Sequence, residues 1–248
     1  MSKRKPLGEQ LYEELSRDII QGRVPPGTNL LPERKMAEAR GLNRGAVREA
    51  MKRLAQMRLI NTVHGGGNRV ADWRDAAGLE LLPDLLVNEA GLPNFDMLRS
   101  LLDMRACLGV DAARRAARIA EPELVQALQD VVEQMRRRPN DIEHLQGLVQ
   151  QFWGVLVRAA ANPVYVMAFN SLDLTWQRYG AHLRHLLSDE LRALSQYQAI
   201  VEACRRHDPE RAAKQAAQLV QMAAEQIEKA ALVYQRRQMV NNGDLFAM

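Results

Sequence analysis

The sequence has few cysteines, few aromatic residues and no long apolar run. Its 248 residues include two cysteines, Cys107 and Cys204, in apolar helical patterns without metal-type spacing, which predicts buried free thiols in a reducing compartment. No apolar run reaches the length of a membrane span, and the basic N-terminus is not followed by the apolar segment of a signal peptide. We therefore expect a cytoplasmic protein without membrane attachment.

Aromatic residues make up 5% of the chain, and Ala, Leu, Gln, Arg and Glu are abundant. This composition favours helices over sheets. The length exceeds that of one ordinary domain, so we expect a mainly α protein with two domains. The predicted parts are an N-terminal domain over 7–71, a linker over 72–79, an all-helical domain over 80–237 and a flexible tail over 238–248.

Positive charge is concentrated in the first third of the chain. Residues 1–72 hold 14 Lys and Arg against 8 Asp and Glu, whereas residues 73–248 hold 20 against 22. A polyanion is the simplest partner for such a segment, because each neutralised phosphate releases counterions. A basic surface without a ligand would show the same charge distribution.

The N-terminal segment has the apolar spacing and the start and stop residues of three short helices. Leu11, Leu15 and Ile19 share one face of a helix over 9–21, and residues 24–28 predict a tight turn because they contain two prolines and a glycine. A second helix is expected over 33–40, ended by a glycine. Asn43 then caps a third helix over 44–58.

This third helix carries cations on one face. Arg44, Arg48 and Lys52 follow one another at every fourth position, and Gly45 is small enough to let the helix start approach base edges. Arginine can bond to guanine in bidentate fashion and lysine can hold phosphates. The opposite face is expected to be apolar, with Val47, Met51 and Leu54. An ordinary solvated basic face remains an alternative for this helix taken alone.

A glycine-tipped hairpin is predicted next, with strands over 59–63 and 69–71. Its glycines would let the backbone pass close to a sugar-phosphate wall, while His64, Asn68 and Arg69 supply donors. A plain flexible turn is the alternative. A nucleotide-binding loop is not supported, because no Gly-Lys-Ser/Thr sequence or helix follows.

Together these motifs resemble the winged helix-turn-helix of the GntR regulator family. The matching stretches are Ile20 with Gly22, Pro26-Gly27-Thr28, Leu31-Pro32-Glu33-Arg34, Gly41-Leu42-Asn43-Arg44, Val47-Arg48-Glu49-Ala50, Leu54, His64-Gly65-Gly66-Gly67 and Val70. The resemblance implies DNA contacts by the following residues: Arg34, Asn43, Arg44, Gly45 and Arg48 from the helices, and His64 and Gly65 from the wing. The serine that the family has between Pro32 and Glu33 is missing, and Gly45-Ala46 replaces small hydroxyl residues, so the half-site sequence is expected to differ.

The remainder predicts about six or seven helices, with breaks near residues 91–93, 121–122, 138–140, 161–163, 187–188 and 207–209. It resembles the FCD-type effector domain of the FadR subfamily. Such domains commonly hold a divalent metal with one Asp and three His. The matching positions here are Val149, Trp153, Tyr197 and Leu219, none of which is a carboxylate or imidazole, so no metal or other cofactor is expected.

The stretch from Asn162 through Asn170 to residues 176–182 resembles the metal-free, fatty-acid-responsive branch of that subfamily. This resemblance implies a long-chain acyl-CoA effector whose binding releases DNA. The residues predicted to line its pocket are Arg105, Trp176, Arg178, Tyr179 and His182. As the alternative, the arginine could belong to an ion pair and the tryptophan to the core.

The sequence thus predicts a transcriptional regulator that binds double-stranded DNA and a small-molecule effector. One winged helix covers few base pairs, so a homodimer on a palindromic operator is expected. No nucleophile–base pair, metal cluster or nucleotide loop supports an enzyme. Two alternatives stay open: a regulator responding to an organic acid or sugar acid, and a helical adaptor with a basic N-terminal module.

Overall fold

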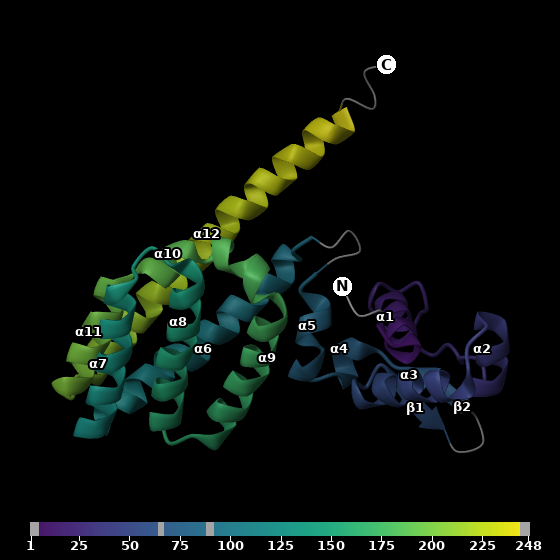
Figure 1. Cartoon of the computed structure of the whole chain (residues 1–248), viewed down its shortest axis with the longest axis horizontal. Helices are drawn as coiled ribbons and strands as arrows, with labels where there is room; N and C mark the ends of the chain where they lie inside the picture. The colour runs from purple at the N-terminus through teal and green to yellow at the C-terminus, as the bar shows by residue number, and fades with distance from the viewer. Residues whose placement is uncertain (1–4, 64–66, 88–91, 244–248) are drawn as a thin grey trace. The chain divides into compact units, whose positions relative to one another are not determined.

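The computed structural model describes residues 5–63, 67–87 and 92–243, apart from the side chains of Val63, His182 and residues 237–243. The chain divides into two compact units, Met1–Leu92 and Pro93–Met248. The structure is mainly helical with one small sheet, as the sequence predicts (Figure 1).

The first unit has the element order of a winged helix-turn-helix. Gly41, with φ 61°, ends the second helix in the left-handed region. Its elements are α1 (Leu7–Ile20), α2 (Glu33–Arg40), α3 (Arg44–Gln56), β1 (Ile60–Val63), β2 (Gly67–Val70), α4 (Trp73–Ala76), the 3-10 helix η1 (Leu79–Leu81) and α5 (Leu82–Leu85).

The core of this unit lies between α1, α3 and the base of the hairpin. Tyr12, Val47 and Leu54 are fully buried there. The two helices approach closely, because a Cβ atom added to Gly8 would lie 2.9 Å from the Ala46 carbonyl oxygen. The start of α3 is therefore held against α1.

A third extended segment pairs with the hairpin, which the sequence did not predict. The backbone amide of Gly27 donates to the Val70 oxygen, and that of Leu30 donates to the Asn68 oxygen, both at 2.8 Å. The sequence indicated only a tight turn over 24–28. This pairing occupies the outer edge of β2 and fixes the base of the wing.

The predicted linker over 72–79 and the predicted start of the helical domain at residue 80 differ from the structure. Most of this segment forms α4 and η1, and the following residues pack on the first unit. Leu81 is fully buried in the same core as α1 and α3. The Tyr12 hydroxyl donates to Asp84 Oδ2 at 2.7 Å, which ties α5 to α1.

The second unit is a helical bundle in which the predicted breaks from residue 121 onward lie between helices, whereas the break at Ala193 between α10 and α11 was not predicted. Within the described residues it has seven helices: α6 (Phe95–Arg118), α7 (Pro122–Arg137), α8 (Ile142–Ala159), α9 (Pro163–Leu186), α10 (Ser188–Arg192), α11 (Leu194–Arg205) and α12 (Pro209–Gly243). The helix α12 runs on past the other helices of the bundle (Figure 1). The prediction of a flexible tail from residue 238 is therefore wrong for residues 238–243, because these residues continue α12. None of the described helices is apolar over a length that would cross a bilayer.

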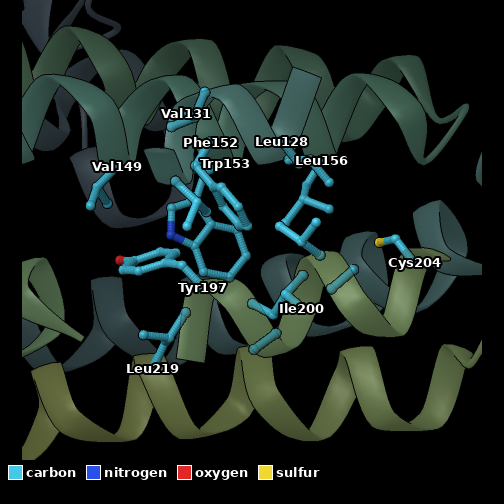
Figure 2. Close-up of a cluster of buried hydrophobic side chains, with 14 of the residues drawn as sticks. Leu128, Val131, Val149, Phe152, Trp153, Leu156, Tyr197, Ile200, Cys204 and Leu219 are labelled. Atoms are coloured by element: carbon cyan, nitrogen blue, oxygen red, sulfur yellow. The ribbon is translucent and has the colours of Figure 1, made fainter. Parts of the chain in front are cut away.

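The bundle core is apolar and aromatic (Figure 2). Phe152 stands edge-on to Tyr197, with ring centroids 5.0 Å apart, and edge-on to Trp153 at 6.5 Å. Cys204 is fully buried, and burial raises the pKa of its thiol to about 11. The prediction of a buried free thiol is confirmed for Cys204, whereas Cys107 is a free but exposed cysteine.

Candidate DNA interface and effector cavity

The outer face of α3 is a row of cations. Arg44, Arg48 and Lys52 are exposed, and the Arg48 side chain remains 75% exposed although its Nε lies 3.4 Å from Glu33 Oε2. The opposite face is buried and consists of Val47, Ala50, Met51 and Leu54. The helix therefore presents its cations outward, as the spacing predicts.

The start of α3 combines a cap with an uncompensated positive end. Asn43 Oδ1 accepts a hydrogen bond from the Ala46 amide at 2.8 Å, and a Cβ on Gly45 would lie 3.2 Å from that oxygen. The first turn contains no acidic residue. Because a helix N-terminus favours anions, this end suits a phosphate group.

The helix α2 adds one more predicted cation. The Arg34 side chain is 64% exposed, with its Nε 4.0 Å from Glu38 Oε1. Exposed ion pairs of this length are weak. The guanidinium of Arg34 is therefore available to another anion.

The wing is described only in part. His64 and Gly65, both predicted to contact DNA, lie outside the described residues. Arg69 Nε donates to the Gly27 carbonyl oxygen at 2.9 Å, and Asn68 Oδ1 accepts from the Thr62 hydroxyl at 3.1 Å. These two wing side chains are thus partly engaged within the first unit, which the sequence did not indicate.

A cavity of about 70 Å³ lies in the second unit between α6, α8, α9 and α12. Arg105 and Trp176, both predicted from the sequence, line it. Most of its wall is apolar, including Leu98, Leu102, Trp153, Phe169, Val220 and Ile227. The apolar stripes of these helices signal burial, but nothing in the sequence distinguishes a cavity wall from a core.

Arg105 is held by a buried ion pair. Its Nη2 lies 2.6 Å from Glu190 Oε1 and its Nη1 donates to Oε2 at 3.1 Å. The Glu190 side chain is 1% exposed and that of Arg105 is 15% exposed. Burial works against the charged guanidinium, but the Glu190 carboxylate outweighs it and raises the pKa of Arg105.

Arg178 and Tyr179, which were also predicted for the pocket, do not lie on the described cavity wall. Arg178 is exposed, and its guanidinium lies 5.4 Å from the centre of the Tyr179 ring. The side chain of His182 lies outside the described part of the chain.

The positions matching the metal ligands of FCD domains form an apolar cluster. Val149, Trp153, Tyr197 and Leu219 are at most 6% exposed and belong to one core (Figure 2). A hard or borderline cation requires carboxylates or imidazoles, so these four side chains do not fit a metal. Elsewhere in the described residues, no group of three or more His, Cys, Asp and Glu side chains converges.

Comparisons with known proteins match both units. Residues 7–70 match the bacterial regulatory proteins of the gntR family, and residues 100–222 match the FCD domain. The HTH-type transcriptional regulator Mce2R of Mycobacterium tuberculosis is 32% identical over 220 residues, which cover 89% of this chain and 91% of that protein. A fatty acid metabolism regulator protein of Shewanella halifaxensis is 28% identical over 184 residues, covering 72% of each chain.

A solved structure shows the same fold. Lar, which controls the expression of the Listeria monocytogenes agr system, matches with a TM-score of 0.61 at 18% identity, over 92% of this chain and 99% of that chain. The relatives are transcription regulators rather than enzymes. The chain therefore belongs to the gntR family of bacterial regulatory proteins, as a DNA-binding transcriptional regulator with an FCD effector domain.

Proposed function

We propose that two copies of the chain bind a palindromic operator, and that an acyl ligand in the helical unit alters this binding. The observation that carries the DNA-binding proposal is the exposed row Arg44, Arg48 and Lys52 on a helix whose opposite face is buried. Such a helix can enter a major groove, where arginine reads guanine and lysine holds phosphate. The proposed contacts are Arg34, Asn43, Arg44, Gly45, Arg48, His64 and Gly65.

The Arg44→Ala variant tests this assignment. We expect specific binding to weaken by about 1–3 kcal/mol and the preference at one base position to relax, as measured by fluorescence anisotropy on operator variants. Arg40→Ala is the control, because it removes an equal charge from a side chain that pairs with Glu14 on α1. Equal losses in both variants would assign Arg44 only a general electrostatic role.

The homodimer follows from the geometry of DNA. Two half-sites place recognition helices roughly 34–36 Å apart, one helical turn of the duplex, and one α3 cannot span both. Sedimentation should give a species of twice the 28.0 kDa chain mass at micromolar concentration. A purely monomeric species on and off DNA would contradict the proposal.

An acyl chain is the effector that suits the cavity best. The wall is largely apolar, and Arg105, the one Lys or Arg among its described lining residues, already engages Glu190. A small organic acid or sugar acid would therefore lack a free cation. The name of the fatty acid metabolism regulators among the relatives supports the same choice.

The size of the cavity suggests how the ligand acts. Its volume of about 70 Å³ is well below the roughly 150 Å³ of a cavity that holds benzene, so a long acyl chain does not fit into it as it stands. Such a chain requires the surrounding helices to separate, and it shifts the regulator toward the conformation that binds it more tightly. The proposed contacts are Arg105 and Trp176 on the cavity wall, together with His182; Arg178 and Tyr179 do not line the cavity and are not proposed as contacts. Palmitoyl-CoA should change operator affinity and free CoA should not; no change with either would contradict an acyl effector.

A further inference from the structure

Two buried donors in the aromatic core of the bundle have no hydrogen-bond partner. These are Trp153 Nε1 and the Tyr197 hydroxyl, on side chains that are 6% and 0% exposed; the described bundle has one more such donor, Arg184 Nε on α9. Both polar atoms lie toward the same end of the aromatic cluster, away from Leu156 and Cys204 (Figure 2). A buried donor left without a partner costs free energy, so two of them together in one core require an explanation.

The neighbouring charges are already neutralised. Burial raises the pKa of Tyr197 well above its ordinary value; the Glu190 carboxylate raises it further, and the Arg105 guanidinium and the neighbouring Trp153 indole N–H lower it. Arg105 and Glu190 form the two-bond ion pair described above. The polar end of the cluster therefore offers donors but no unpaired cation.

The cavity adjoins this polar end, because both Arg105 and Trp153 are part of its wall. We propose that Trp153 and Tyr197 donate hydrogen bonds to a carbonyl oxygen of a fatty acyl thioester or ester whose chain occupies the cavity. A carbonyl oxygen has two lone pairs and donates nothing, which matches two donors. An ionised carboxylate would lose its hydration without gaining an opposite charge. This inference rests on the proposed acyl effector.

The test compares ligands that differ in this carbonyl alone. Palmitoyl-CoA and its thioether analogue S-hexadecyl-CoA, with a methylene in place of the carbonyl, are titrated into the full chain by calorimetry. We expect the thioether to bind about tenfold more weakly, the value of two ordinary hydrogen bonds. Tyr197→Phe should weaken palmitoyl-CoA binding several-fold and leave thioether binding unchanged. Trp176→Phe, which changes a residue of the cavity wall, should weaken both ligands equally.

A spectroscopic readout separates hydrogen bonding from packing. The chain has three tryptophans, Trp73, Trp153 and Trp176. In nitrogen-15 spectra, the indole N–H resonance that is missing from the Trp153→Phe variant belongs to Trp153. That resonance should move downfield with palmitoyl-CoA but not with the thioether. Equal affinities with an unmoved resonance would overturn the carbonyl assignment and leave the acyl effector standing. Tighter binding of free palmitate than of palmitoyl-CoA would also overturn it, whereas failure of all three ligands to bind would contradict the proposed function itself.

Discussion

Each unit of the molecule buries one tyrosine completely, and the two hydroxyl groups differ in their hydrogen bonding. The Tyr12 hydroxyl in the DNA-binding unit donates to Asp84, and Arg53 lies 4.0 Å from the centre of its ring. The Tyr197 hydroxyl in the helical unit has no partner. The first unit thus satisfies its buried phenol by itself, whereas the second leaves one unsatisfied next to a cavity.

The largest loss of stability is expected when the ion pair near Tyr197, between Arg105 and Glu190, is broken. Arg105→Ala would leave the Glu190 carboxylate buried without a partner, and breaking a buried pair costs about 3–5 kcal/mol. Chemical denaturation should show this loss in the helical unit. The matched control is Arg99→Ala on the same helix, whose pair with Glu228 is exposed and whose loss should change stability little. Equal small losses would mean that water already screens the Arg105 pair.

The sequence predicts the helices better than it predicts what they bring together. The proline-containing breaks locate the starts of α6, α7, α8, α9 and α12 because they act locally, whereas no proline or glycine marks the break at Ala193 between α10 and α11. The pairing of residues 27–30 with β2 is long-range and has no periodicity of its own. The helix α4 is four residues long, too short for a pattern, so its segment resembles a linker.

The same limit applies to the candidate sites. The outward face of α3 follows from helical spacing alone. Arg105 could be selected as a pocket residue, but its partner Glu190 lies 85 positions away, and only the fold makes them neighbours. Arg178 and Tyr179 were selected by resemblance, which carries no information on the direction of their side chains.

An intermediate effect is expected in the first unit. Tyr12→Phe removes a hydrogen bond to a carboxylate and should lower the free energy of unfolding by about 1.5–3 kcal/mol. Because Asp84 belongs to α5, the variant should also increase amide exchange over η1 and α5. Unchanged exchange would show that the apolar contacts of Leu81 hold this segment without the hydrogen bond. Asp84→Asn is the matched variant, since it keeps an acceptor for Tyr12.

The smallest change in stability is expected at Tyr197. Unlike the Arg105 and Tyr12 variants, this variant should not be destabilised. Tyr197→Phe removes a hydroxyl that has no partner, so the ligand-free chain should be equally stable or slightly more stable at neutral pH. The pKa of Tyr197 is raised in the folded state, so the unfolded phenol ionises first, from about pH 10. The folded wild type therefore loses stability as the pH rises above that value, and the variant should lose less. Thermal denaturation at pH 8 and above pH 10 measures both effects, with Tyr12→Phe as the contrast because it is destabilised at pH 8. Destabilisation of the Tyr197 variant at pH 8 would mean that the hydroxyl has a partner in solution, such as a bound water, and the difference between the two units would disappear.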